Sequence, residues 1–171
     1  RLEFKGRNIV FILYLSTMMI PITVRLIPSY NLCRNLNMLD TYMGMILPQV
    51  AWSIPFGTFL MRQFYMGIPK QLDEAAKIDG ANHFQIFWKI LLPNTKSSMA
   101  TLGIYTFISA WNNLIWMLLS VRSESKWTVT LGISSICGAS VIKQPTWNLI
   151  MGVIVIGMIP VLILFFAFQK Y

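Results

Sequence analysis

Four long stretches without a charged side chain constrain this sequence more than any other feature. They run over 8–24, 41–61, 97–121 and 144–169 and hold 17, 21, 25 and 26 residues. A transmembrane helix needs about 20 mostly apolar residues to cross a hydrocarbon core of roughly 30 Å. The chain is 56% apolar and only 12% charged, which leaves too few charges to cover the surface of a soluble domain. We therefore predict an all-α fold, a multi-span transmembrane helix bundle.

The stretches suggest one membrane domain over residues 1–171. Spans are expected at about 8–27, 41–63, 97–121 and 146–169, with a long connection over 64–96. Four spans place both chain ends on one side, and with those ends inside, the inner segments hold 9 Lys and Arg against 5 in the outer loops. This bias predicts a cytoplasmic position for 64–96. A fifth uncharged stretch, 127–142, holds seven Thr, Ser and Gly, which favours an interfacial or re-entrant helix.

Composition argues against several other classes of protein. The net charge of +8 is scattered between apolar stretches and does not form the basic face of a nucleic-acid-binding protein. One His and two Cys are too few for a metal centre or a disulfide framework. No Gly is followed by Lys, so the phosphate-binding loop of ATPases is absent. We expect no catalytic residues, no metal ligands and no enzyme activity in this chain.

The connection over 64–96 carries start and stop signals for two short helices. Pro69 suits a first helical position, where its missing N–H costs nothing. Gly80 favours a left-handed residue that ends the first helix, and Asn82 with Gln85 predicts a capping box at the start of the second. Pro93 is expected to stop the second helix. Its apolar face is expected to consist of Phe84, Phe87, Trp88 and Leu91. The sequence predicts a helix, a sharp glycine turn and a second helix outside the bilayer.

The same connection contains a motif of fixed spacing. Glu74, Ala75 and Ala76 are followed after three residues by Gly80, and nine residues later by Ile90, Leu92 and Pro93. This pattern resembles the EAA motif, E-A-A-x3-G-x9-I-x-L-P, of the membrane permeases of binding-protein-dependent ABC importers. The strings FGTFLMRQFY before the loop and FISAWNNLIW after it are similar to carbohydrate importers of the maltose and glycerol-3-phosphate type. Such permeases commonly have six spans, which implies that these four are the last four and that two precede Arg1.

The resemblance implies that the loop is a coupling helix, which docks in a cleft of a cytoplasmic ATPase subunit. It assigns the contact to Glu74, Ala75, Ala76 and Gly80, and implies that Ile90, Leu92 and Pro93 hold the loop against the bundle. Small alanine side chains suit helix-in-groove binding, and the carboxylates of Glu74 and Asp79 suit a basic rim. The alternative is an amphipathic hairpin on the lipid surface, which would need more Lys or Arg opposite its apolar face.

One face of the third predicted span carries polar and aromatic side chains. They recur at steps of four, four, three and four residues: Thr101, Tyr105, Ser109, Asn112 and Trp116. Amide and hydroxyl groups beside aromatic rings suit a pathway for a polyhydroxylated solute, and polar groups at that depth must face protein or water. Asn113 is expected to share this role, as are Gln49 and Ser53 on the second span. The alternative is that Ser109 and Asn112 only bond a neighbouring helix.

These observations predict a permease subunit of an ATP-driven importer for a sugar or related polyol, in the bacterial inner or cytoplasmic membrane. The resemblance implies a second permease subunit, a pair of ATPase subunits that bind ATP and Mg²⁺, an external solute-binding protein and the lipid bilayer as partners, with no cofactor in this chain. A rival is an importer of the same architecture for an amino acid or oxyanion. Another is an ion-coupled transporter or a scaffold, although the four stretches contain no charge. Arg25 and Arg34 are expected in an outer loop or snorkelling to the interface.

Overall fold

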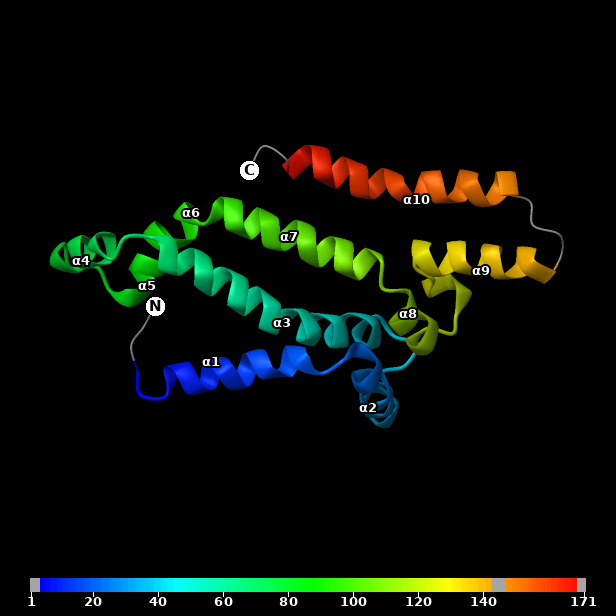
Figure 1. The fold of residues 1–171 in the computed structure, drawn as a ribbon, viewed down its shortest axis with the longest axis horizontal. Coiled ribbons are helices and arrows are strands. Elements are labelled where there is room, and N and C mark those ends of the chain that lie inside the picture. Colours follow the sequence, from blue (N-terminus) through cyan, green and yellow to red (C-terminus); the bar gives the residue numbers. More distant parts are fainter. Residues whose placement is uncertain (1–3, 143–146, 169–171) are drawn as a thin grey trace. The chain divides into compact units, whose positions relative to one another are not determined.

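Every regular element in the part of the chain that the structure describes, residues 4–142 and 147–168, is helical, which confirms the all-α prediction. The computed structural model contains α1 (Arg7–Ser16), a 3-10 turn (Thr17–Met19), α2 (Ile22–Asn35), α3 (Tyr42–Gly67), α4 (Gln71–Ile78), α5 (His83–Ile86), a π-helical turn (Phe87–Leu91), α6 (Leu92–Asn94), α7 (Lys96–Trp111), α8 (Leu114–Ser120), a 3-10 turn (Glu124–Lys126), α9 (Val129–Ile142) and α10 (Trp147–Phe168) (Figure 1). Residues 146 and 169, the ends of the last predicted span, lie outside the described residues.

Among the described residues, two helices are long and apolar enough to cross a membrane alone, and the number rises to four if each of two bent helix pairs is one span. The single helices are α3 and α10. The bent pairs are α1 with α2, and α7 with α8. The first predicted span, 8–27, is therefore not one straight helix. It is interrupted before Pro21, because proline disfavours a helical conformation in the residue that precedes it.

The described helices form two compact units. The first comprises residues 4–19 and 53–105, and the second comprises 20–52, 106–142 and 147–168. In the first unit, the ring of Phe56 on α3 lies 4.2 Å from the ring of Tyr105 on α7, measured between centroids. The guanidinium of Arg62 lies 3.9 Å from the ring centroid of Phe11, a cation–π contact between α3 and α1. Aromatic contacts therefore join α1 and α7 to α3 within this unit.

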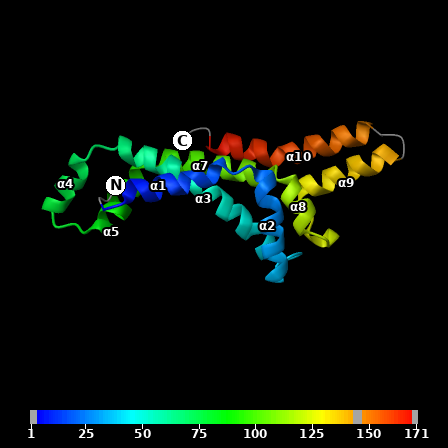
Figure 2. The ribbon, with the colours of Figure 1, turned by 60° about the horizontal axis from the view of Figure 1, so that its bottom comes forward.

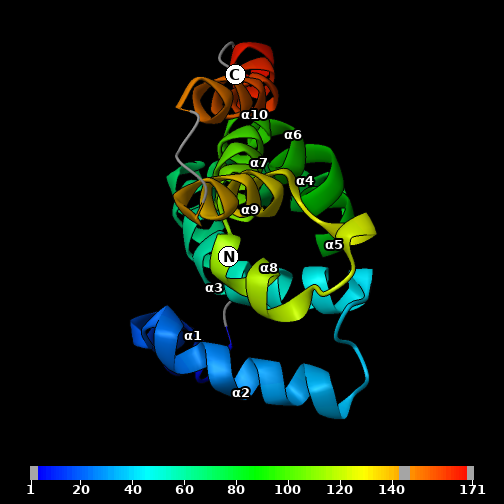
Figure 3. The same cartoon turned by 90° about the vertical axis from the view of Figure 1, so that its right-hand side faces the viewer.

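The second unit has its own apolar core. Its buried members are Leu26, Cys33, Met45, Trp116, Met117, Val121 and Leu131. Helices α9 and α10 run antiparallel and side by side (Figures 2 and 3). They approach closely at Gly157, where a Cβ would lie only 2.7 Å from the Cδ1 of Ile133. With 14 residues, α9 is shorter than a helix that crosses a bilayer.

Candidate functional site

The turn between α4 and α5 forms a tightly specified elbow in the first unit (Figure 1). Gly80 has φ +81°, a left-handed conformation that residues with a Cβ avoid. The N–H of Ala81 donates to the carbonyl of Ala76 at 2.9 Å, and the N–H of Gly80 donates to the carbonyl of Lys77 at 3.0 Å. This pair of bonds is a Schellman motif, which satisfies the last carbonyls of α4. The structure confirms the predicted glycine turn.

The start of α5 is also as the sequence predicts. The Asn82 side chain accepts a hydrogen bond from the backbone N–H of Gln85 at 2.8 Å, and the Gln85 side chain accepts one from the backbone N–H of Asn82 at 2.9 Å. This reciprocal capping box satisfies two backbone donors that the helix itself leaves unpaired. Both sides of the elbow are therefore fixed by local hydrogen bonds, independently of any partner.

A small apolar cluster fills the inside of the elbow. Its buried members are Ala76, Ile86 and Leu91, and the partly buried Tyr65, Ile68, Ala81 and Ile90 pack against them. The two alanines of the motif therefore face different surroundings, because Ala76 is 7% exposed whereas Ala75 is exposed to solvent. The small size of Ala76 serves packing within the loop. Only Ala75 lies on the surface that a partner could contact.

The helix that follows the elbow, formed by α5, the π-helical turn and α6, does not end at Pro93 as the sequence predicts. The helical path continues through Asn94 and ends at Thr95, so Pro93 does not stop it. A π-helical turn precedes the proline, in which the N–H of Leu92 donates to the carbonyl of Phe87, five residues earlier. Proline has no N–H to donate to the carbonyl four residues before it, so one hydrogen bond of a regular α-helix is missing here. The wider π-helical turn accommodates this missing bond, and the helix continues. Leu92 is half-buried here and Pro93 is exposed.

The prediction of the apolar face over α5 and the π-helical turn is also only partly confirmed. Leu91 is buried and Phe87 half-buried, but Phe84 is 72% exposed and Trp88 is exposed as well. Ile86 takes the buried position instead. Ile86 and Leu91 are five residues apart, which is the spacing of a π-helical turn. A search for apolar residues at steps of three and four therefore does not place Ile86 on the buried face.

The outer surface of the elbow combines carboxylates with exposed apolar side chains. Glu74 and Asp79 are exposed, as is Ala75 between them. Ile78, which the sequence analysis missed, is 86% exposed on the same helix. Ile78 and Ala75 therefore give the outer surface of the elbow an apolar part beside its two carboxylates.

The predicted polar face of the third span is broken. Thr101, Tyr105 and Ser109 lie on α7 and are exposed, but α7 ends at Trp111 and α8 begins at Leu114. Asn113 caps α8, because its side chain accepts a hydrogen bond from the backbone N–H of Trp116 at 3.3 Å. The prediction that Trp116 continues this face is therefore wrong. Asn112, which is exposed, lies at the break itself.

Trp116 belongs to the core of the second unit. It is 0% exposed, and its indole Nε1 donates a hydrogen bond to the carbonyl of Gly44 on α3 at 3.1 Å. Its ring meets Trp52 edge to face, with centroids 5.2 Å apart. The guanidinium of Arg25 on α2 lies over the Trp52 ring at 5.8 Å from the centroid. These contacts connect α2, α3 and α8.

The two second-span candidates lie on α3 and are half-buried. The side-chain amide of Gln49 donates to the carbonyl of Met45 at 3.1 Å, one turn earlier. This bond uses an N–H and leaves the side-chain carbonyl as an acceptor. Ser53 follows one helical turn later, as the sequence predicts.

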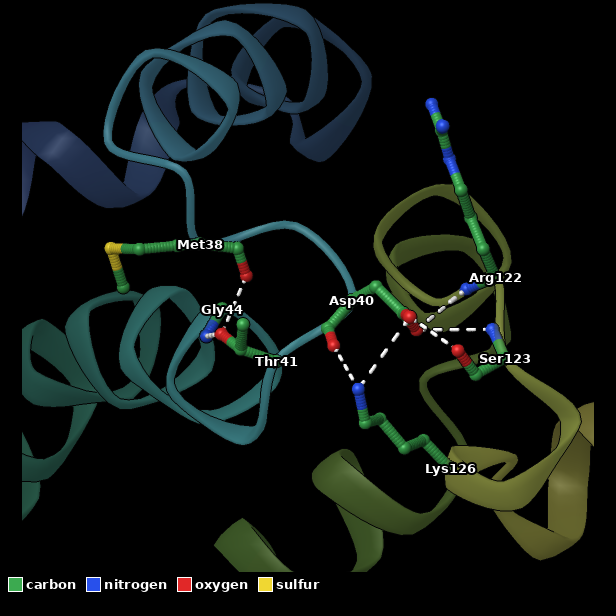
Figure 4. A network of polar contacts seen from close by, with 7 residues as sticks. All are labelled: Met38, Asp40, Thr41, Gly44, Arg122, Ser123 and Lys126. Atoms are coloured by element: carbon green, nitrogen blue, oxygen red, sulfur yellow. Dashed lines mark hydrogen bonds and ion pairs between the residues drawn. The ribbon is translucent and has the colours of Figure 1, made fainter.

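Asp40, a residue that the sequence analysis missed, joins two loops of the second unit (Figure 4). Its carboxylate accepts hydrogen bonds from the backbone N–H groups of Arg122 and Ser123, both at 3.0 Å, and from the Ser123 hydroxyl. Lys126 donates to the Asp40 carbonyl and forms an ion pair with its carboxylate at 3.5 Å. One feature of the sequence could have indicated a role for Asp40, since it is the only acidic residue between Glu3 and Asp73.

These donors explain the electrostatics of Asp40. The hydrogen bond from the Ser123 hydroxyl, followed by the two backbone N–H groups and the charge of Lys126, lowers the pKa of this carboxyl well below its usual range. Asp40 has φ +57°, a conformation that Asp tolerates better than most residues. The ionised carboxylate therefore fastens the loop before α3 to the loop after α8.

Comparison with known proteins places these features in context. The family described as "Binding-protein-dependent transport system inner membrane component" matches residues 1–171. The chain is 40% identical over 170 residues to the sn-glycerol-3-phosphate transport system permease protein UgpE of Yersinia enterocolitica, which covers 99% of this chain and 59% of that protein. It is 35% identical over 169 residues to the arabinooligosaccharides transport system permease protein AraQ of Bacillus subtilis, covering 99% and 58%. The chain thus spans about three fifths of the length of these curated relatives.

Proposed function

The chain belongs to the family of binding-protein-dependent transport system inner membrane components, and from this premise we propose that it is the permease subunit of an ATP-driven importer for a sugar or related polyol. Its apolar helices fit the membrane location of that family. The names of two relatives support the solute class, since one is a permease for sn-glycerol 3-phosphate and the other for arabinooligosaccharides. A second permease subunit, a pair of ATPase subunits and an external solute-binding protein complete the proposed importer.

The observation that carries the proposal is the elbow between α4 and α5. Its Schellman motif, capping box and apolar cluster hold its shape without a partner, while Ala75 and Ile78 remain on the outside. A rigid, partly apolar surface of this kind suits docking in a protein groove. A hairpin on an anionic lipid surface is less favoured, because Glu74 and Asp79 are exposed beside the same apolar side chains.

We propose that Glu74, Ala75, Asp79 and Gly80 form or shape the surface that contacts the ATPase, while Ala76, Ile90, Leu92 and Pro93 support it from behind. ATP and Mg²⁺ bind the ATPase subunits, and this chain has no enzyme activity or cofactor of its own. ATP shifts the membrane helices between inward- and outward-facing states only through its different affinity for the two. The solute pathway is proposed to include Tyr105, Ser109, Asn112, Asn113, Gln49 and Ser53.

A substitution series at Gly80 tests the coupling role. A Cβ at this position meets no atom within 4 Å, so any effect comes from the left-handed backbone and not from a clash. Gly80→Val should weaken ATPase binding most, and Gly80→Asn should be tolerated best, because Asn visits this conformation more readily. Gly67→Ala is the matched control, since its Cβ is equally unobstructed and its φ is not positive.

The measurements are co-purification of the ATPase subunits and ATP-dependent uptake by the full importer in proteoliposomes. Full coupling in the Gly80→Val variant would contradict the proposed role of the elbow. Uptake without ATP that collapses with an ion gradient would instead support the ion-coupled alternative. Binding of an amino acid and of no carbohydrate to the purified external receptor would remove the sugar assignment.

A further inference from the structure

Arg25 places a cationic side chain in the second unit. It lies on α2, half of a bent helix pair that is a candidate span. In the described part of the chain no carboxylate forms an ion pair with it, and its buried Nε has no hydrogen-bond acceptor. The contact that its side chain does make is with the ring of Trp52, 5.8 Å from the guanidinium carbon to the centroid. An ionisable side chain on a candidate span, without an anionic partner among the described residues, is the starting point for a functional-site hypothesis.

The ring below Arg25 is held in place from the protein interior. The rings of Trp52 and Trp116 form a T-shaped pair with an interplanar angle of 79°, and Trp116 is completely buried. Trp116 is in turn anchored by its hydrogen bond to the carbonyl of Gly44. Neither Trp52 nor Arg25 is itself fully buried, so part of each faces outwards. The result is a fixed aromatic platform with a cation on it.

The chemistry of this platform suits an oxyanion attached to a polyol. A guanidinium presents a planar fork of N–H donors that binds two oxygens of a phosphate or carboxylate at once. Gln49, one helical turn before Trp52 on α3, has a side-chain carbonyl that can accept a hydrogen bond from a hydroxyl.

We propose that Arg25, which lies over the ring of Trp52, binds an oxyanion group, phosphate or carboxylate, carried by the transported solute. Gln49, one helical turn before Trp52, is proposed to accept a hydrogen bond from a hydroxyl of the same solute. This inference rests on the proposed importer function and narrows its solute to anionic polyols. Trp116 acts as a positioning residue that fixes Trp52. A phospholipid headgroup offers the same chemistry as a phosphorylated solute, so the test must separate the two sources.

The test uses the assembled importer in a nonionic detergent without ATP, which makes the binding readout independent of transport. Isothermal titration compares sn-glycerol 3-phosphate and glycerate with glycerol, the same polyol lacking the charge. We expect at least one of the two anions to bind more tightly than glycerol. Hydrogen bonds to a charged group are strong enough that Arg25→Gln should weaken this binding by roughly 10- to 100-fold.

Arg34→Gln is the matched control, because it removes the same charge from an exposed position on the same helix and should leave binding unchanged. Arg25→Lys keeps the charge but loses the fork, and should show intermediate binding. If the Arg25→Gln variant fails to assemble with the ATPase subunits, the binding measured with Arg25→Lys tests the proposed role of Arg25. Native mass spectrometry measures the phospholipid that co-purifies with each variant.

Three results would overturn the inference: equal binding of glycerol and both anions, equal weakening in the Arg34→Gln variant, or unchanged solute binding in Arg25→Gln with loss of bound phospholipid. The last result would assign Arg25 to a lipid headgroup. Failure of the importer function itself appears separately, as absence of ATP-dependent uptake of any solute by the wild-type complex.

Discussion

Gly44, near the start of α3, is a position where one methyl group should disturb three contacts. The N–H of Gly44 donates to the Thr41 hydroxyl at 3.1 Å, and this hydroxyl donates to the Met38 carbonyl at 2.7 Å. The Gly44 carbonyl accepts the indole N–H of Trp116. A Cβ on Gly44 would lie 2.1 Å from the Met38 carbonyl oxygen, far inside van der Waals contact. Gly44→Ala must therefore push two backbone segments apart.

The expected magnitude follows from the bonds that this movement breaks. Loss of the Thr41 cap costs about 1 kcal/mol. A buried Trp116 N–H without its acceptor costs about 1 to 3 kcal/mol. Alanine regains about 1 kcal/mol through its higher helix propensity. The net loss of about 1 to 3 kcal/mol corresponds to a fall in Tm of roughly 3 to 10 °C for a chain of this size.

Thermal unfolding of the purified complex, followed by tryptophan fluorescence, measures this effect. Gly57→Ala is the control on the same helix, because its Cβ would lie at an ordinary 3.5 Å from the methyl groups of Leu102. It should leave Tm unchanged or raise it slightly. Equal Tm values for the two variants would refute the argument that Gly44 is required for close approach.

The remaining predictions concern the other fixed points of the structure. Because the pKa of Asp40 is lowered on folding, its contribution to stability is present above the pKa of the unfolded chain, near 3.9, and is lost as the pH falls through the lower folded value. The difference in Tm between wild type and Asp40→Asn should therefore be constant from pH 5 to 8 and shrink below about pH 4. Trp116→Phe should lower Tm, whereas Trp88→Phe, at an exposed position, should not, as thermal unfolding will show. Ala76→Leu should raise hydrogen exchange across α4 and α5, because overpacking costs about 1 to 3 kcal/mol. Ala75→Leu should leave exchange unchanged, and the reverse order would contradict the burial of Ala76.

The amino-acid sequence alone determined the features that depend on local rules. Gly80, Asn82 and Gln85 specify the elbow because left-handed turns and helix caps involve residues only a few positions apart. The uncharged stretches specified a helical membrane protein because their length suits transmembrane helices, in which the polar backbone groups bond within the segment. The fixed spacing of the motif around Glu74 was sufficient to indicate the family, which the match over the whole chain then showed.

The tertiary structure decided which side of each element is used. Helical spacing placed Trp116 on the same face as Ser109, but the break at Asn112 and Asn113 turns it into the core of the second unit. The paired alanines look equivalent in sequence, yet packing against Ile86 buries one and leaves the other exposed. Asp40 meets its partners more than 80 residues away along the chain. Such contacts depend on the path of the whole backbone, and a local pattern carries no information about that path.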